Sequence, residues 1–345
     1  MFFMVSDRNK NPKGLGPDHA PLSFWTATAG PLNKINSWKE VSRAVFKNQL
    51  LRQAEKFPDI QDPAEHEEQK HVTFFVHGYN TSWAEAADRY TALCEKLFTG
   101  NESLGVCAFF TWPSDDMTLG YYPDRIDARK SGPDLADVLS DLYDYLQNQE
   151  VVAVEQPQKK CKAKTSIIAH SMGNFVLQKA MQLVWTRKNR PLLLSLANQL
   201  LMVAADVDND LFKGGENVDG SDGDAIANLS YRITALYSGR DAVLGMSAGL
   251  KHFGKRRLGR SGLDRTYPVP DNVWDIDCSN LFAPGQKNIH SGYFYEDRTM
   301  ELMRHLLRGV DRNVLRAAGF VPTPLSGVEK AAVAEAGLAP ASVNP

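Results

Sequence analysis

The chain has 345 residues, of which 43% are hydrophobic and 23% charged, a composition typical of globular proteins that bury a sizeable core. Its formal net charge of −2 gives no electrostatic reason to bind nucleic acid or an anionic membrane. No apolar run reaches the length of a membrane span, and the N-terminal segment lacks the charge order of a signal peptide. Four scattered cysteines without a CxxC pair suit reduced thiols, so we expect a cytoplasmic protein.

In the N-terminal part of the chain we predict two strands, then one helix, then a further strand. The segments "FFMVSDR" and "LSFWTAT" are predicted strands separated by a Gly/Pro loop. Residues 37–56 repeat apolar positions at helical spacing, with Ser37 as the candidate N-cap. A polar loop then leads to the apolar run "VTFFVHGYN", which predicts a further strand.

From residue 83 onward, helices and strands alternate. Helices are predicted at 83–97, at 127–148 with a start near Pro133, at 173–187 and, as the last one, at 296–310. Strands are predicted at "GVCAFFTWPS", "TSIIAHS", "QLLMVAADVD", "YRITALYSGRD" and "NVWDIDCSN". This alternation favours an α/β fold with a mostly parallel twisted sheet and helices on both faces. We predict one domain at residues 1–317 and a flexible Ala/Pro-rich tail at 318–345.

The segment "AHSMG" places Ser171 between a buried-type strand and an amphipathic helix. This is the context of the nucleophile elbow G-x-S-x-G, in which small residues on either side let neighbouring backbones approach. Ala169 replaces the first glycine, and Gly173 is retained. The N–H of Met172, at the positive end of the following helix, is the first expected oxyanion donor.

A second oxyanion donor is expected from the loop that follows the strand "TFFV". We assign it to the backbone N–H of Tyr79, with Asn80 next. His77 precedes the serine in the chain, and we interpret it as a residue that shapes this turn by hydrogen bonding. Trp112 suits either an acyl pocket or packing at the sheet edge. The candidate substrate-pocket residues are His77, Asn80, His170 and Trp112.

The remaining catalytic partners of such a serine follow it in the order acid, then histidine. Two acids lie at predicted strand ends, and we favour Asp241 over Asp206 because the acid usually follows the later strand. His290 lies in the loop before the last predicted helix, where the base belongs. His252 lies in a basic segment and His305 inside the last helix, so both are weaker candidates for the base.

Three other motifs indicate neither a metal nor a cofactor. "HEEQKH" has one residue too many for a zinc-binding H-E-x-x-H, and "DVDND" lacks the glycine and the last ligand of a calcium loop. "GKRRLGRS" does not follow an apolar strand, as a phosphate-binding loop would. We interpret residues 251–260 as a basic surface loop that could attract an anionic substrate or lipid headgroup.

These landmarks together resemble the α/β-hydrolase superfamily, and within it an uncharacterised bacterial family of esterase/lipase-like proteins. The matching segments are "FFMVSDR", "VHGYN", "FTWPS", "AHSMGN", "MVAADVD", "YSGRDAVLGMS", "RLG" and "HSGYF". The resemblance implies the α/β-hydrolase fold and the catalytic set Ser171, Asp241 and His290. It does not extend to residues 53–70 or to the Ala/Pro tail.

We therefore expect a cofactor-independent serine hydrolase that cleaves a small-molecule carboxylic ester through an acyl-enzyme on Ser171. Lipase-type esters and thioesters are variants of this substrate class. The alternative is a binding or scaffold protein that keeps the hydrolase fold without turnover. The natural substrate and the oligomeric state are not encoded in any pattern of the sequence.

Overall fold

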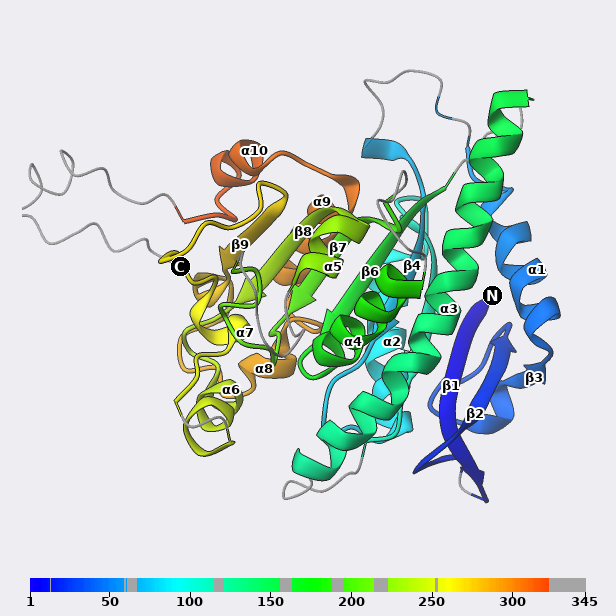
Figure 1. Cartoon of the computed structure of the whole chain (residues 1–345), viewed down its shortest axis with the longest axis horizontal. Helices are drawn as coiled ribbons and strands as arrows, with labels where there is room; N and C mark the ends of the chain where they lie inside the picture. The colour runs from blue at the N-terminus through cyan, green and yellow to red at the C-terminus, as the bar shows by residue number, and fades with distance from the viewer. Residues whose placement is uncertain are drawn as a thin grey trace, which may run out of the picture.

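The computed structural model describes residues 1–322 apart from residues 13, 59, 61–66, 115–120, 156–162, 188–194, 214–222 and 252–253. Nine strands form one sheet in the order β3-β2-β1-β5-β4-β6-β7-β8-β9 (Figure 1). Strand β2 is antiparallel to both of its neighbours, and all other adjacent pairs are parallel. The strands are β1 (Phe2–Asn11), β2 (Gly14–Ala27), β3 (Lys39–Val41), β4 (His71–Val76), β5 (Gly105–Thr111), β6 (Lys164–His170), β7 (Ala197–Val203), β8 (Ser230–Tyr237) and β9 (Val273–Asp277).

Helices cover both faces of this sheet, as the sequence predicted (Figure 1). One face carries α1 (Arg43–Ala54), α3 (Tyr121–Glu155), α4 (Gly173–Arg187) and α5 (Asp224–Leu229). The other face carries α2 (Trp83–Leu97), α9 (Asp297–Arg308) and α10 (Arg312–Ala317). Short helices between these elements are η1 (Ile35–Ser37), α6 (Ala242–Met246), the π-helical turn η4 (Ser247–Lys251), α7 (Leu258–Ser261), η5 (Ser279–Leu281) and α8 (Ile289–Gly292).

Strand β4 explains why the central strands read as continuous apolar runs. Phe74 and Val76 point into the core beneath α1, α3 and α4, whereas Phe75 points into the core beneath α2 and α9. Because both faces are covered, neither set of alternating positions meets water. The α/β fold with a mostly parallel sheet is thus confirmed.

The start of the chain differs from the prediction in two places. Strands β1 and β2 extend through the expected Gly/Pro loop and form a long hairpin that ends with Asn11 paired to Gly14. Helix α1 begins at Arg43, and its N-cap is Ser42, whose hydroxyl accepts a hydrogen bond from Val45 N at 3.3 Å. The predicted cap, Ser37, belongs instead to η1, because the residues after it pair with β2 as strand β3.

Helix α3 runs through Pro133, so the predicted start near this residue was wrong. A proline inside a helix removes one hydrogen bond, and tertiary packing must offset that loss. The helix packs closely on α4 at this point, since a Cβ on Gly132 would lie 2.9 Å from Lys179 Cβ. Leu135 and Leu139 of the same turns are fully buried.

The end of the chain also departs from the prediction. The helix expected to be last, α9, is followed by α10, and Phe320 and Val321 are buried in the core beneath α9. Residues 323–345 lie outside the described part, so the division into 1–317 and 318–345 stays a prediction. Of the four cysteines, Cys94, Cys107 and Cys278 are buried free thiols, and Cys161 lies outside the described residues. Within the described ranges, no helix is both long enough and apolar enough to cross a bilayer.

One buried histidine of the core gives the fold a pH-dependent stability. His71 begins β4 without solvent exposure, and its Nδ1 lies 3.2 Å from the Ser166 hydroxyl. Burial, with a smaller contribution from Lys164 and Lys70, lowers the pKa of His71 to about 3. In the unfolded chain the His71 imidazole binds a proton near pH 6.5, whereas in the folded chain it stays neutral until about pH 3. The free energy of unfolding therefore falls as the pH drops from 6.5 toward 3.

We expect wild-type protein to lose about 2 kcal/mol more of its unfolding free energy between pH 7 and pH 5 than the His71→Gln variant. Urea unfolding at the two pH values measures this difference. His305→Gln, at a histidine whose side chain is 32% exposed in α9, is the matched control and should keep the wild-type pH dependence. Parallel pH profiles for wild type and His71→Gln would show that His71 does not carry the effect.

Candidate active site

The turn between β6 and α4 holds Ser171 in a left-handed backbone conformation, with φ at 51°. Helix α4 starts only two residues later, at Gly173. A Cβ on Gly173 would lie 2.3 Å from the carbonyl oxygen of His77 and 2.8 Å from that of Val76. A glycine is therefore required here, because the turn lies directly against the end of β4. Ala169, in place of the first motif glycine, is buried within β6.

Three further hydrogen-bonding groups hold this turn. Ser171 N donates to Val203 O of β7 at 2.9 Å, and Asp206 N donates to Ser171 O at 3.1 Å. The side-chain amide of Asn174 donates to Ala169 O at 2.9 Å and to Ser171 O at 3.1 Å. Sequence reasoning missed Asn174, although it follows the motif glycine directly in "AHSMGN".

The structure brings Ser171, His290 and Asp241 together from three different elements. His290 Nε2 lies 2.9 Å from Ser171 Oγ, and His290 Nδ1 lies 2.7 Å from Asp241 Oδ2. An ionised carboxylate only accepts hydrogen bonds, so Nδ1 carries the hydrogen and Nε2 is left as the acceptor for the serine hydroxyl. Ser171 is 3% exposed and the His290 side chain 11%. This geometry suits proton transfer from serine to histidine.

Local structure fixes the acid and the base in these positions. Asp241 follows β8 and is the N-cap of α6, with its Oδ1 accepting from Leu244 N at 3.0 Å. The guanidinium of Arg260 donates to the Asp241 carbonyl oxygen. His290 lies in the short helix α8, between β9 and α9, where the sequence predicted a loop. Asp241 is fully buried, so its carboxylate has one fixed orientation toward the imidazole.

The other candidate acid, Asp206, has a different partner. Its Oδ1 accepts from Arg257 Nε at 2.8 Å and from the Ser247 hydroxyl at 3.0 Å. Arg257 is fully buried and also pairs with Asp208. Asp206 therefore anchors the segment before α7.

This arrangement also corrects the expected basic surface loop at residues 251–260. Lys255 and Arg256 are exposed, but Arg257 lies in the protein interior and Arg260 holds the backbone beside Asp241. His252 and the side chain of Lys251 lie outside the described residues. Sequence reasoning missed the roles of Arg257 and Arg260, because their partners, the Asp206 carboxylate and the Asp241 carbonyl oxygen, lie far from them along the chain.

The loop after β4 packs onto the serine turn. A Cβ on Gly78 would lie 2.7 Å from Ser171 Cβ and 2.9 Å from His170 Nδ1, so only glycine allows this approach. Asn80, like Ser171, is a non-glycine residue with positive φ, and Ala204 after β7 is the third among the described residues. Tyr79, the predicted second oxyanion donor, directly follows the glycine that packs against Ser171.

A buried hydrogen-bond network holds this loop, and His77 is its centre. Trp112 N donates to His77 Nε2 at 3.1 Å, so His77 Nδ1 carries the hydrogen and donates to Gly78 O at 2.8 Å. The Thr111 hydroxyl also lies 3.1 Å from Nε2 and accepts from Arg8 Nε at 2.9 Å. Burial holds the pKa of His77 well below its usual range, so the imidazole stays neutral and this network keeps its direction.

Two sequence-predicted pocket residues are interior packing residues in the described structure. Trp112 is fully buried, stacks on His77 with ring centroids 5.4 Å apart, and donates from Nε1 to His77 O at 2.8 Å. His170 Nε2 donates to the carbonyl oxygen of His290 at 2.9 Å, and burial holds its pKa well below the usual range. His170 is therefore a neutral support for the backbone of His290. His305 lies in α9 near Glu301 and contributes nothing to this cluster.

The metal motifs set aside in the sequence are only partly described. His71 of "HEEQKH" lies in β4, whereas His66 lies outside the described residues. Asp208 of "DVDND" pairs with Arg257 and Lys255. Asn217, at the position of the last ligand of a calcium loop, lies outside the described residues.

Comparison with known sequences identifies a family. The model of a family described as "Alpha/beta hydrolase of unknown function (DUF900)" matches residues 52–271. The resemblance to α/β hydrolases is thereby confirmed, and the match includes residues 53–70, which that resemblance left out. It ends before His290. The uncharacterized protein alr1448 of Nostoc sp. is 30% identical over 129 residues, which cover 31% of this chain and 30% of that protein.

Two solved esterase structures are also similar to this chain. An esterase of Pyrobaculum calidifontis shares 12% identity, with 77% of this chain and 91% of that chain covered and a TM-score of 0.36. Carboxyl esterase 2 of the fungus Tuber melanosporum shares 10% identity, with 70% and 79% covered and a TM-score of 0.35. At these values no residue role is transferred from either structure.

Proposed function

Because the chain belongs to the DUF900 family of α/β hydrolases, we propose that it is a serine hydrolase that cleaves carboxylic esters through an acyl-enzyme on Ser171. The observation that supports this proposal most is the unbroken hydrogen-bonded line from Ser171 Oγ through the His290 ring to Asp241 Oδ2. A nucleophile, a base and a group that orients the base are the minimum set for acyl transfer.

Each residue has one role in the proposed reaction. Ser171 Oγ attacks the ester carbonyl carbon while His290 Nε2 takes the hydroxyl proton. Asp241 holds the Nδ1–H tautomer and stabilises the imidazolium that forms. His290 then gives the proton to the departing alkoxide, which leaves as the alcohol. Water, deprotonated by His290, attacks the acyl-enzyme and releases the acid and free Ser171.

Charge that develops on the substrate oxygen requires preorganised donors. The Met172 N–H lies at the start of α4 and has no hydrogen-bond partner among the described residues, so it can donate to the substrate oxygen. The Tyr79 N–H is the second proposed donor, brought close because Gly78 packs against Ser171. The close approach of Gly78 to Ser171 supports an oxyanion site shared by these two turns.

A fluorophosphonate probe tests the nucleophile. We expect stoichiometric labelling of the wild-type chain, with the modified peptide carrying Ser171, and none in Ser171→Ala. His290→Gln should lower the labelling rate on the order of 10⁴-fold, because the hydroxyl then lacks its base. The matched variant His305→Gln should label at the wild-type rate. Folded wild-type protein that resists the probe would instead favour the non-catalytic scaffold.

A further inference from the structure

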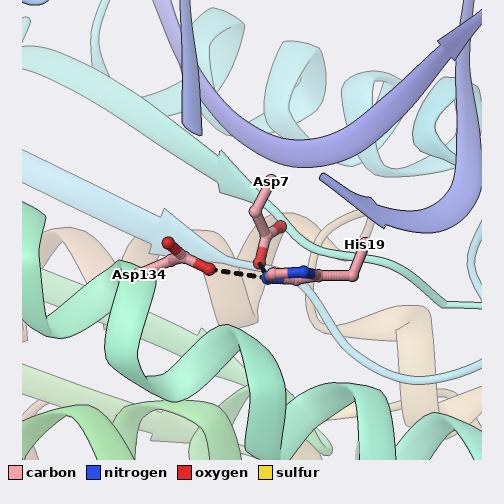
Figure 2. A group of neighbouring side chains, drawn as sticks. All are labelled: Asp7, His19 and Asp134. Atoms are coloured by element: carbon pink, nitrogen blue, oxygen red, sulfur yellow. Dashed lines mark hydrogen bonds and ion pairs between the residues drawn. The ribbon is translucent and has the colours of Figure 1, made fainter. Parts of the chain in front are cut away.

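A second cluster of titratable groups lies apart from the serine site, where the N-terminal hairpin meets α3. Asp7 of β1, His19 of β2 and Asp134 of α3 converge on one point (Figure 2). His19 Nε2 lies 2.7 Å from Asp134 Oδ2 and 3.9 Å from Asp7 Oδ2. One ligand-type atom from each residue falls within 4.8 Å of the other two.

Strand alternation explains why a carboxylate is buried here. Phe3 and Val5 of β1 point into the core beneath α3, and Asp7 is the next residue of that alternation. The pairing register of β1 with β2 shifts between Ser6 and Arg8, so Asp7 lies within an irregularity of the strand. A charged residue therefore takes a position that the pattern reserves for an apolar one.

The Asp7 carboxylate lacks the hydrogen bonds that a buried carboxylate normally has. Its side chain is 0% exposed, and neither oxygen has a hydrogen-bond partner of adequate geometry among the described residues. The Ser131 hydroxyl lies beside this carboxyl, but neither group has a hydrogen-bond partner of adequate geometry in the described part of the chain. A buried carboxylate without hydrogen bonds is costly unless it is protonated, paired or bound to a metal ion, and a metal ion would supply the missing partner for the ionised form.

We propose that Asp7, His19 and Asp134 bind one divalent transition-metal ion, with Zn²⁺ as the best match. Two carboxylates balance the charge of a divalent cation, and an imidazole nitrogen favours Zn²⁺ over Ca²⁺ or Mg²⁺. Zn–O and Zn–N bonds of about 2.0–2.2 Å in a tetrahedral site separate ligand atoms by about 3.4 Å. Each of the two distances at His19 therefore needs to change by only about 0.5–0.7 Å.

The surroundings leave room for the rest of the coordination sphere. The side chains of His19 and Asp134 are 34% and 22% exposed, so a water molecule can reach the metal from outside and complete four ligands. Asp7 has no exposed side-chain surface and closes the site toward the interior, and Figure 2 shows its carboxylate directed at the His19 ring. This combination of one dry ligand and two solvent-facing ligands gives the ion an entry path.

The proposed ion would tie the hairpin to α3. Arg8, the residue after Asp7, donates to Thr81 O at 2.9 Å and to the Thr111 hydroxyl at 2.9 Å. These two contacts hold the loop that carries the proposed oxyanion donor. The metal site is thus one residue away from the group that fixes this loop, and it does not depend on the proposed hydrolase activity.

Calorimetric titration of the chelator-treated full chain with Zn²⁺ tests the site. We expect one equivalent to bind to wild-type protein, and Asp7→Asn and His19→Gln each to weaken binding by at least about 100-fold. Two variants are needed because Asp7 is buried and its substitution could disturb folding, whereas His19 is partly exposed. His305→Gln is the matched control, since His305 also belongs to a partly exposed His–carboxylate pair, with Glu301 at 3.9 Å.

X-ray absorption of the zinc-loaded protein separates this site from any other. We expect a shell of nitrogen and oxygen atoms at about 2.0–2.2 Å and no sulfur at about 2.3 Å. A sulfur shell would place the metal on a cysteine and overturn the proposal. The proposal is also overturned if wild-type protein binds less than one equivalent, or if His19→Gln binds Zn²⁺ as tightly as wild type does.

Discussion

Asp241→Asn is expected to lower the rate of ester hydrolysis on the order of 10⁴-fold, without a matching loss of folded protein. The asparagine amide can present its oxygen or its NH₂ group to His290 Nδ1, which no longer fixes the hydrogen on that nitrogen. In the alternative tautomer, Nε2 carries the hydrogen and cannot accept the proton of Ser171. Turnover of p-nitrophenyl acyl esters of graded chain length measures the loss and reports the preferred substrate size.

Asp206→Asn is the matched comparison, because Asp206 also follows a strand and is buried. Its carboxylate pairs with Arg257 and Ser247, so the variant should lose stability while each folded molecule keeps its rate to within about tenfold. Circular dichroism establishes the folded fraction used to normalise the rates. A loss of rate in Asp206→Asn with none in Asp241→Asn would reverse the assignment of the acid.

Arg257→Met is expected to lower the free energy of unfolding by about 3–5 kcal/mol. Arg257 is fully buried and bonded to Asp206 Oδ1, to the carbonyl oxygen of Asp206 and to Asp208. Methionine fills much of the same volume but removes the buried guanidinium that pairs with the Asp206 carboxylate. Urea unfolding at pH 7 measures the change.

A double variant identifies the cause of that loss. Arg257→Met combined with Asp206→Leu removes both charges, so it should be more stable than the sum of the two single changes predicts, by about 1–3 kcal/mol. Arg256→Met, at the exposed neighbouring position, should change stability by less than about 0.5 kcal/mol. Strict additivity in the double variant would mean that lost packing, and not the loss of the Arg257–Asp206 pair, accounts for the effect.

The serine site shows how far the sequence alone could lead. The order of Ser171, Asp241 and His290 along the chain predicted that they meet, because parallel strands bring the loops at their carboxyl ends to one edge of the sheet. The three side chains lie within hydrogen-bonding distance in the structure. Their roles in a reaction, and those of Met172 and Tyr79, stay predictions until activity is measured.

The supports of the site could not be predicted in the same way. Arg257 lies in a run of basic residues, and composition assigns such runs to the surface because an unpaired cation is costly to bury. Its partner Asp206 lies 51 positions away, and no local pattern records that pairing. Arg8 is a similar case, since the groups it holds, Thr81 in the loop after β4 and Thr111 at the end of β5, lie far from it in the sequence.

The sequence-based prediction of helix boundaries failed for a related physical reason. The propensity of Pro133 to start a helix is a local preference, and the packing of α3 against α4 outweighs it. The hairpin of β1 and β2 continued through glycine and proline residues because pairing between the two strands stabilises what the local sequence does not. Local preferences were reliable only where tertiary contacts agreed with them, as in α2 and α4.

The left-handed backbone at Ser171 sets the stability of the fold against the need for a side chain at this position. Glycine adopts this conformation at no steric cost, whereas a residue with a Cβ gives up about 1 kcal/mol or more to do so. A chain selected only to persist would therefore carry glycine at position 171. In the described part of the chain, Ser171 shares this conformation with only two other non-glycine residues, Asn80 and Ala204, and the strain at position 171 is a cost that the proposed nucleophile would justify.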